Sequence, residues 1–185
     1  MKTIGFFGGS FDPVHFGHVN LAVEMLEKAD LDEVLFCPAF CSPFKTHAPP
    51  ASSGEHRFRM LELALSGVPR CRVTPIEIEK NAPSFTVETL RKLQAPGLRF
   101  KLILSDEAAA AFEQWREPQE ILRMAPLLIG ARAGGRFDKK GGVQTRVLEI
   151  SSTEIRARLK EKKYCAHLVP QIVLDYIEEN NLYFV

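Results

Sequence analysis

Hydrophobic runs and helical repeats alternate along the chain, and their order predicts the fold. Apolar, β-prone residues fill positions 3–7, 34–37 and 100–104, which is the pattern of buried strands. After the first run, Val19 and Leu26 belong to a series of apolar residues at helical spacing, which predicts an amphipathic helix. Strand, helix and strand in succession are typical of a parallel sheet.

The rest of the chain continues this alternation, and it has no internal repeat. The pattern therefore predicts one α/β domain over residues 1–185, a Rossmann-like, doubly wound parallel sheet with a small C-terminal helical portion at 151–185. Ser84 is a candidate helix cap, and Ser151 with Glu154 has the spacing of a capping box. Further helices are expected at 58–65, 86–93, from Glu107, at 151–160 and around 172–177, and further strands at 72–78, 126–130 and 147–150.

Two segments show neither the apolar pattern of a strand nor that of a helix. Residues 38–54 are rich in Pro, Ser and Ala, and a loop of this length in a compact domain is often a binding loop or lid. We therefore expect a substrate loop there. Residues 133–142 are polar and flanked by glycines, which predicts a mobile surface loop.

Composition narrows the function classes. The chain has 185 residues, of which 45% are hydrophobic and 25% charged, as in an ordinary globular protein. A formal net charge of +1 disfavours a nucleic-acid binder, which would usually be clearly basic. No apolar run approaches the roughly 20 residues that span a bilayer, and the N-terminus makes a poor signal peptide. We expect a cytoplasmic protein without membrane contact.

The cysteines show no dense disulfide pattern. Cys37, Cys41 and His47 are candidate zinc ligands, but no fourth ligand lies at a familiar spacing, so reduced cysteines are favoured. No protein metal site is predicted. The charged residues of the final helices indicate a solvated face and leave a homo-oligomeric interface open.

The segment from Gly8 to His18 carries the chemistry. Gly8 and Gly9 follow the first predicted strand, where a chain without side chains can turn tightly and point N–H groups at an anion. The next helix begins near Gly17, so its N-terminus adds donors and a partial positive charge. These features predict a phosphate site. The segment is neither a Walker loop nor a dinucleotide fingerprint.

His15 and His18 are three residues apart at the expected helix entrance, so both imidazoles can face the same concavity. Two histidines there can donate hydrogen bonds to a phosphate that is being transferred. Gly17 leaves room beside the backbone for a ligand. The alternative is a helix-capping pair without chemistry, and the strand and glycine pair beside it favour the catalytic interpretation.

Several segments resemble one family. Residues 8–18 are similar to the (H/T)-x-G-H signature of the nucleotidylyltransferase superfamily, and residues 8–15 resemble nicotinate-nucleotide adenylyltransferases. Residues 150–156 resemble that family's I-S-S-T-x-I-R motif, and residues 84–90 its S-Y-T-x-x-T-L substrate segment. Trp115, the single tryptophan, matches the family residue that stacks on the pyridine ring.

The resemblance implies transfer of AMP from ATP to nicotinate mononucleotide, a step of NAD biosynthesis, with Mg²⁺ carried by the ATP phosphates. It implies catalytic roles for His15, His18 and Arg156. The expected ATP- and phosphate-binding residues are Gly8, Gly9, Ser10, Phe11, Gly17, Ser105, Asp106, Glu107, Ser152 and Thr153, and the expected substrate-binding residues are Lys45, Ser84, Thr86, Trp115 and Arg132.

The sequence departs from the family at one place. Where the family usually has Gly-x-Asp, this chain has Ser105-Asp106-Glu107, so either carboxylate is a candidate for the nucleotide ribose. Lys45 also stands in a local pattern that differs from the family's P-P-H-K. Three alternatives remain open: a related enzyme acting on nicotinamide mononucleotide, one acting on phosphopantetheine, and a nucleotide-binding regulator without catalysis.

Overall fold

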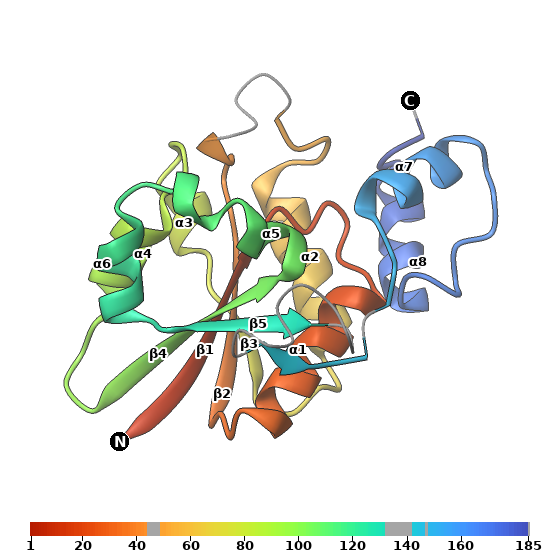
Figure 1. Cartoon of the computed structure of the whole chain (residues 1–185). Helices are drawn as coiled ribbons and strands as arrows, with labels where there is room; N and C mark the ends of the chain where they lie inside the picture. Colours follow the sequence, from red (N-terminus) through yellow and green to blue (C-terminus); the bar gives the residue numbers. More distant parts are fainter. Residues whose placement is uncertain (44–48, 132–141, 147, 185) are drawn as a thin grey trace.

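The computed structural model describes residues 1–43, 49–131, 142–146 and 148–184. Among them, six strands form one sheet in the order β3-β2-β1-β4-β5-β6, and every neighbouring pair is parallel (Figure 1). The strands are β1 (Lys2–Gly9), β2 (Glu33–Pro38), β3 (Cys71–Val73), β4 (Leu98–Ser105), β5 (Leu127–Ala131) and β6 (Val143–Gln144). The predicted α/β, Rossmann-like sheet is confirmed.

The strand order reverses beside β1, which pairs with both β2 and β4. The first half of the chain builds the sheet outward from β1 to β3, and the second half builds it the other way, from β4 to β6. In open sheets of this kind, ligands bind beyond the carboxyl ends of the strands at such a reversal. The fold thus points to the ends of β1 and β4.

Helices cover both faces of the sheet (Figure 1). Neighbouring side chains of a strand point to opposite faces, so Phe6 and Phe7 of β1 enter two separate cores. On the Phe7 side lie α1 (Phe16–Lys28), α2 (Gly54–Leu65), α7 (Ser152–Lys160) and α8 (Gln171–Glu179); on the Phe6 side lie α4 (Thr86–Leu93), α6 (Pro118–Met124) and the 3-10 turn η2 (Phe112–Gln114). The short helices α3 (Ile76–Glu79) and α5 (Asp106–Ala110) complete the described helices.

Two predicted strands are wrong. The strand expected at 72–78 ends at Val73, and Pro75 is the N-cap of α3. Proline cannot donate to a sheet ladder and is well suited to the start of a helix. The strand expected at 147–150 is replaced by β6, which ends at Gln144. There the chain leaves the sheet, and the Arg146 carbonyl accepts a hydrogen bond from Asn20 of α1.

One predicted cap is wrong, and a second is right in position but lacks its side-chain hydrogen bond. Phe85, not Ser84, is the N-cap of α4, and the Ser84 hydroxyl instead accepts the Phe40 N–H at 3.0 Å. Ser151 is the N-cap of α7, but its side chain makes no cap hydrogen bond. Ser84 therefore fastens the start of the segment at 38–54.

The predicted loops are only partly visible. In the segment at 38–54, residues 44–48 lie outside the described residues, as does all of 133–142 except Gly142. The expected lid and mobile loop stay predictions. No helix within the described ranges is long and apolar enough to cross a membrane.

Candidate active site

A cavity of about 800 Å³ opens at the carboxyl ends of β1 and β4. Its size suits a nucleotide-sized ligand. All but two of the residues expected in the site line it: Gly8, Gly9, Ser10, Phe11, His15, Gly17, His18, Ser84, Thr86, Ser105, Asp106, Glu107, Trp115, Ser152, Thr153 and Arg156. Lys45 and Arg132 lie outside the described residues. The structure thus brings segments from the whole chain to one place.

The glycine pair does not form the predicted turn. Gly8 and Gly9 belong to β1 and still pair with Cys37 and Pro38 of β2. The left-handed residue is Phe11, with φ of 49°, a conformation that costs a bulky residue about 1–2 kcal/mol. A Cβ on Gly9 would lie 3.0 Å from the Phe11 ring. Gly9 therefore makes room for the ring that folds back over it.

His15 and His18 form a stacked pair at the start of α1. His15 is the N-cap, its backbone N–H donates to His18 Nδ1 at 3.3 Å, and the two ring centroids are 3.7 Å apart. A Cβ on Gly17 would lie 3.0 Å from His15 Nδ1, so Gly17 admits this imidazole. The pair therefore shapes the helix end, as the capping alternative holds, and also lines the cavity.

Burial keeps both imidazoles neutral at pH 7. It lowers the pKa of His15 from 6.5 to about 4, and burial, followed by the nearby His15, lowers the pKa of His18 well below 6.5. Because His18 Nδ1 accepts the His15 N–H, the ring proton of neutral His18 must be on Nε2. His18 is thus a neutral hydrogen-bond donor through Nε2.

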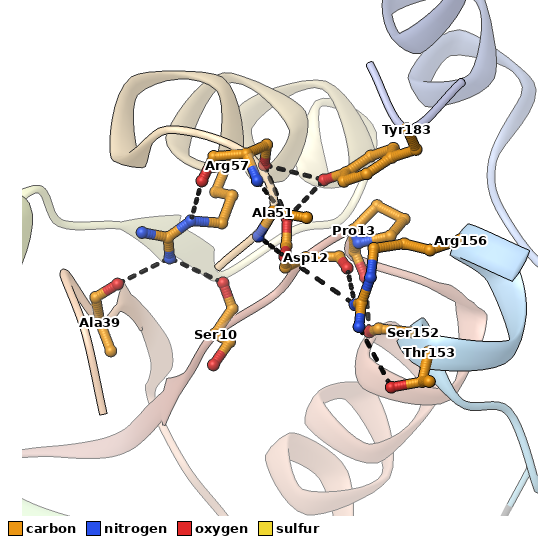
Figure 2. Close-up of polar contacts among 11 residues, drawn as sticks. Ser10, Asp12, Pro13, Ala39, Ala51, Arg57, Ser152, Thr153, Arg156 and Tyr183 are labelled. Atoms are coloured by element: carbon orange, nitrogen blue, oxygen red, sulfur yellow. Dashed lines mark hydrogen bonds and ion pairs between the residues drawn. The ribbon is translucent and has the colours of Figure 1, made fainter. Parts of the chain in front are cut away.

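The start of α7 is joined directly to the turn after β1 (Figure 2). Arg156 Nη1 donates to the Asp12 carbonyl at 2.6 Å and lies 3.8 Å from the Asp12 carboxylate, while Nη2 donates to Thr153 Oγ1 at 3.2 Å. The Ser152 hydroxyl donates to the Pro13 carbonyl at 2.9 Å. Two motifs far apart in sequence therefore form one wall, which we call the phosphate end of the cavity.

Trp115 and the residues before α4 line another part of the cavity, which we call the ring end. Trp115 follows η2, is half-buried and packs on Phe112 with the ring centroids 5.5 Å apart. Thr86 is the first residue of α4, so the N-terminus of that helix borders the cavity. The ring end thus combines an aromatic face with a helix N-terminus, where N–H groups favour a negative group.

Residues 6–158 match the family described as Cytidylyltransferase-like. Relatives from Salinibacter ruber and Rhodopirellula baltica that match this chain carry the name "Probable nicotinate-nucleotide adenylyltransferase". They are 37% and 36% identical to this chain, cover 98% of it, and are themselves covered over 97% and 94% of their lengths. The chain belongs to the nicotinate-nucleotide adenylyltransferases.

Solved structures of this family share the fold. A Plasmodium falciparum nicotinic acid mononucleotide adenylyltransferase complexed with NaAD matches with a TM-score of 0.78 and 19% identity, over 99% of this chain and 98% of that one. The same Plasmodium enzyme complexed with APC gives a TM-score of 0.73 and 21% identity, with the same coverage. At this identity the likeness concerns the sheet and its helices.

Sequence reasoning missed the buried polar residues that support this family site. Arg57 is 1% exposed and lies on the core-facing side of α2. It donates to four backbone carbonyls, those of Ser10, Ala39, Phe40 and Ser52, at 2.6–3.2 Å. Its spacing to Leu61 and Leu65 places it on the apolar face of the helix, and this position was the available indication.

Glu77 was also missed. Its carboxyl is buried, accepts a hydrogen bond from Thr89 Oγ1 at 2.6 Å, and borders the cavity at the ring end. Burial raises the pKa of Glu77, although hydrogen bonds from Thr89 and Ser84 oppose the shift. Glu77 thus links α3 to the substrate segment.

Proposed function

We propose that this protein transfers the adenylyl group of ATP to nicotinate mononucleotide, giving nicotinate adenine dinucleotide and pyrophosphate. The observation that carries the proposal is the single cavity that joins the phosphate end, at Arg156 and His18, to the ring end, at Trp115. A dinucleotide-forming enzyme needs both, because it must hold two phosphate groups in contact and recognise one aromatic ring.

The reaction needs no protein nucleophile. The second pKa of a phosphate monoester is about 6, so the attacking oxygen of the mononucleotide is already anionic at neutral pH. It attacks the α-phosphorus of ATP, the bond to the bridging oxygen breaks, and pyrophosphate leaves with the electron pair. The obstacle is repulsion between two polyanions, which positioning and hydrogen-bond donors must offset.

His18 supplies the principal donor in this proposal. Its Nε2–H, fixed by the acceptor role of Nδ1, stabilises the charge that develops on the α-phosphate oxygens, together with backbone N–H groups near Ser10 and Phe11. His15 contacts the triphosphate. Gly8 and Gly9 line the same part of the cavity.

The start of α7 receives the leaving pyrophosphate. Arg156 and the Thr153 hydroxyl contact the β- and γ-phosphates, aided by the N–H groups of the first helical turn. The Ser152 hydroxyl already donates a hydrogen bond to the Pro13 carbonyl, so Ser152 contacts the phosphates through its backbone N–H. Either Asp106 or Glu107 accepts from the ribose hydroxyls of the nucleotide, with Ser105 holding the start of α5 through Ala108.

Mg²⁺ enters with ATP in this proposal, since it binds phosphate oxygens and keeps several waters. Within the described residues no group of three or more His, Cys, Asp or Glu is placed to hold a metal. When bound, Mg²⁺ would neutralise part of the charge on the phosphates. Excess EDTA should stop turnover and added Mg²⁺ should restore it; full activity in EDTA would contradict this part.

The ring end selects the mononucleotide. Trp115 stacks on the pyridine ring, and backbone N–H groups at Thr86 donate to the carboxylate of the substrate. The amide of nicotinamide mononucleotide would turn an amino donor toward these N–H donors in place of one acceptor oxygen. Ser84 holds this segment through its bonds to Phe40 and Cys41. Phosphopantetheine has no ring for Trp115 to stack on. Substrate contacts of Lys45 and Arg132 remain part of the proposal.

The product identifies the activity. The purified chain with Mg²⁺, ATP and nicotinate mononucleotide should release pyrophosphate and form a dinucleotide of the expected mass. Omitting the mononucleotide should abolish pyrophosphate release. Nucleotide binding without either product would instead indicate a regulator that has lost catalysis.

A further inference from the structure

Asp12 is the centre of a buried hydrogen-bond network that reaches the C-terminus of the chain (Figure 2). Its side chain is 5% exposed. Oδ1 accepts from Ser52 Oγ at 2.7 Å, from Ser52 N at 3.2 Å and from the Tyr183 hydroxyl at 2.6 Å, and Oδ2 accepts from Ala51 N at 2.7 Å. A buried carboxylate with this many donors is held in one orientation.

The network bears on the phosphate end through Arg156. The same aspartate accepts Arg156 Nη1 at its carbonyl, and its carboxylate is 3.8 Å from that nitrogen. A guanidinium with a charged neighbour and a fixed carbonyl acceptor has few orientations left. Whatever fixes Asp12 therefore also fixes the direction in which Arg156 faces the cavity.

Tyr183 reaches Asp12 from outside the cavity. It lies 171 residues from Asp12 in sequence, beyond the end of α8, and it is absent from the residues that line the cavity. Burial and the nearby Asp12 charge both raise the pKa of Tyr183, so its hydroxyl remains protonated and donates. Its ring packs with the core on the Phe7 side of the sheet.

We infer that Tyr183 is a positioning residue for adenylyl transfer: by donating to Asp12, the C-terminal segment fixes Arg156 toward the triphosphate. The inference rests on the function proposed above. Because Tyr183 does not touch the cavity, its effect passes through Asp12 and Arg156. Loss of the hydroxyl should therefore weaken the use of ATP and leave the ring end unaffected.

The chain offers a matched control in Tyr176. Its hydroxyl bonds His56 Nδ1 at 2.8 Å, so Tyr176→Phe also removes one hydroxyl between the C-terminal region and α2, but away from Asp12. Tyr183→Phe should lower kcat/KM for ATP about tenfold, the usual effect of losing one hydrogen bond to a charged group, chiefly by raising KM for ATP. KM for nicotinate mononucleotide should stay within about twofold of wild type. In Tyr176→Phe, both KM for ATP and KM for nicotinate mononucleotide should stay within about twofold of wild type.

Two outcomes would overturn the inference. One is equal kinetics for Tyr183→Phe and Tyr176→Phe. The other is a fall in kcat alone with KM for ATP unchanged, which is the result of a smaller folded fraction. If Tyr183→Phe does not fold, Ser52→Ala removes the other hydroxyl that donates to Asp12 Oδ1, and it should show the same rise in KM for ATP.

A double-mutant cycle tests the route. In an Arg156→Lys background, Tyr183→Phe should cost less than about twofold in kcat/KM for ATP, because the group it positions is gone. A full tenfold loss in that background would refute positioning through Arg156. A wild-type chain without pyrophosphate release would refute the proposed function itself, whereas an active wild type with unchanged Tyr183→Phe kinetics would refute only this inference.

Discussion

At the phosphate end of the cavity, buried polar groups hold the wall in place: Arg57 binds four carbonyls, and Asp12 joins the turn after β1 to α7. The ring end is built differently. Its short helices are joined by ion pairs between half-exposed side chains, such as Arg91 with Glu117 and Arg116 with Glu88. The phosphate end is held by buried hydrogen bonds, whereas the ring end is held by ion pairs at the surface.

This difference matches what each end must do in the proposed reaction. Phosphoryl transfer depends on atoms held within a fraction of an ångström, so a rigid wall raises the rate. A flat ring needs only a face to stack on, which tolerates adjustment. Changes at the phosphate end should therefore alter kcat, KM for ATP or the stability of the fold, and changes at the ring end should alter KM for the mononucleotide.

His18→Ala should give the largest effect on the rate. It removes the Nε2–H donor, and the loss of one such donor typically lowers kcat by about 10²–10³-fold. Steady-state kinetics measure it, while circular dichroism checks that the fold is intact. His56→Ala, which alters a histidine of α2 outside the cavity, is the control and should retain kcat. A His18→Ala variant with near-normal turnover would remove His18 from the mechanism.

Arg57→Leu should give the largest effect on stability. It leaves four backbone carbonyls, among them that of Ser10 in the turn after β1, without their donor, and the free energy of unfolding should fall by about 3 kcal/mol. The neighbouring Arg59 pairs with Glu62 at the surface, and Arg59→Leu should change stability by no more than about 0.5 kcal/mol. Urea unfolding compares the two. Equal free energies of unfolding for Arg57→Leu and Arg59→Leu would mean that buried hydrogen bonds do not hold the phosphate end in place.

Trp115→Ala should act on KM. Loss of ring stacking is worth about 1–3 kcal/mol, so KM for nicotinate mononucleotide should rise about fivefold or more while KM for ATP stays nearly constant. Trp115→Phe keeps an aromatic face and should recover most of the affinity. If KM for ATP rises instead, the ring end has been assigned to the wrong nucleotide.

The pH dependence of stability should report the phosphate end. Since the pKa of His15 in the folded protein, about 4, lies below its ordinary 6.5, the unfolded chain binds more protons between these values. Stability is therefore complete above pH 6.5 and falls as the pH drops toward 4, by up to about 1.4 kcal/mol per pH unit for each such histidine. His15→Gln should flatten this slope in urea unfolding. An unchanged slope would contradict the neutral, buried His15.

Arg91→Ala should have the smallest effect. Arg91 pairs with Glu117 through side chains that are 47% and 43% exposed, and exposed pairs contribute little. Both KM values should stay within about twofold of wild type in steady-state assays. A large rise in KM for the mononucleotide would show that the surface ion pairs, and not only Trp115, determine how well the ring end binds its substrate.

The sequence predicted the parts that depend on local pattern. Apolar runs located β1, β2 and β4 because a buried strand must be apolar along its length. Contiguous motifs located the phosphate end, since the residues at 8–18 and 150–156 keep their chemistry close together in sequence. Trp115 and Ser84 were placed at the cavity by resemblance alone.

The parts that failed depend on contacts between distant segments. Gly9 was expected to turn the chain, but its space is filled by the Phe11 ring. Ser84 was expected to cap a helix, but it accepts Phe40 N–H across the cavity rim. No local pattern predicts the hydrogen bond from Tyr183 to Asp12, because the two residues are 171 positions apart in sequence. Neither the flanking residues nor the hydrophobic periodicity contains information about this contact.

Competition between two mononucleotides tests the central claim most directly. With Mg²⁺ and ATP, nicotinate mononucleotide and nicotinamide mononucleotide are offered to the enzyme together, and the two dinucleotide products are quantified by mass spectrometry. The ratio of products gives the ratio of kcat/KM values. We expect the acid product to dominate by at least about tenfold, the discrimination of roughly one well-placed recognition group. Equal products, or a majority of the amide product, would contradict it.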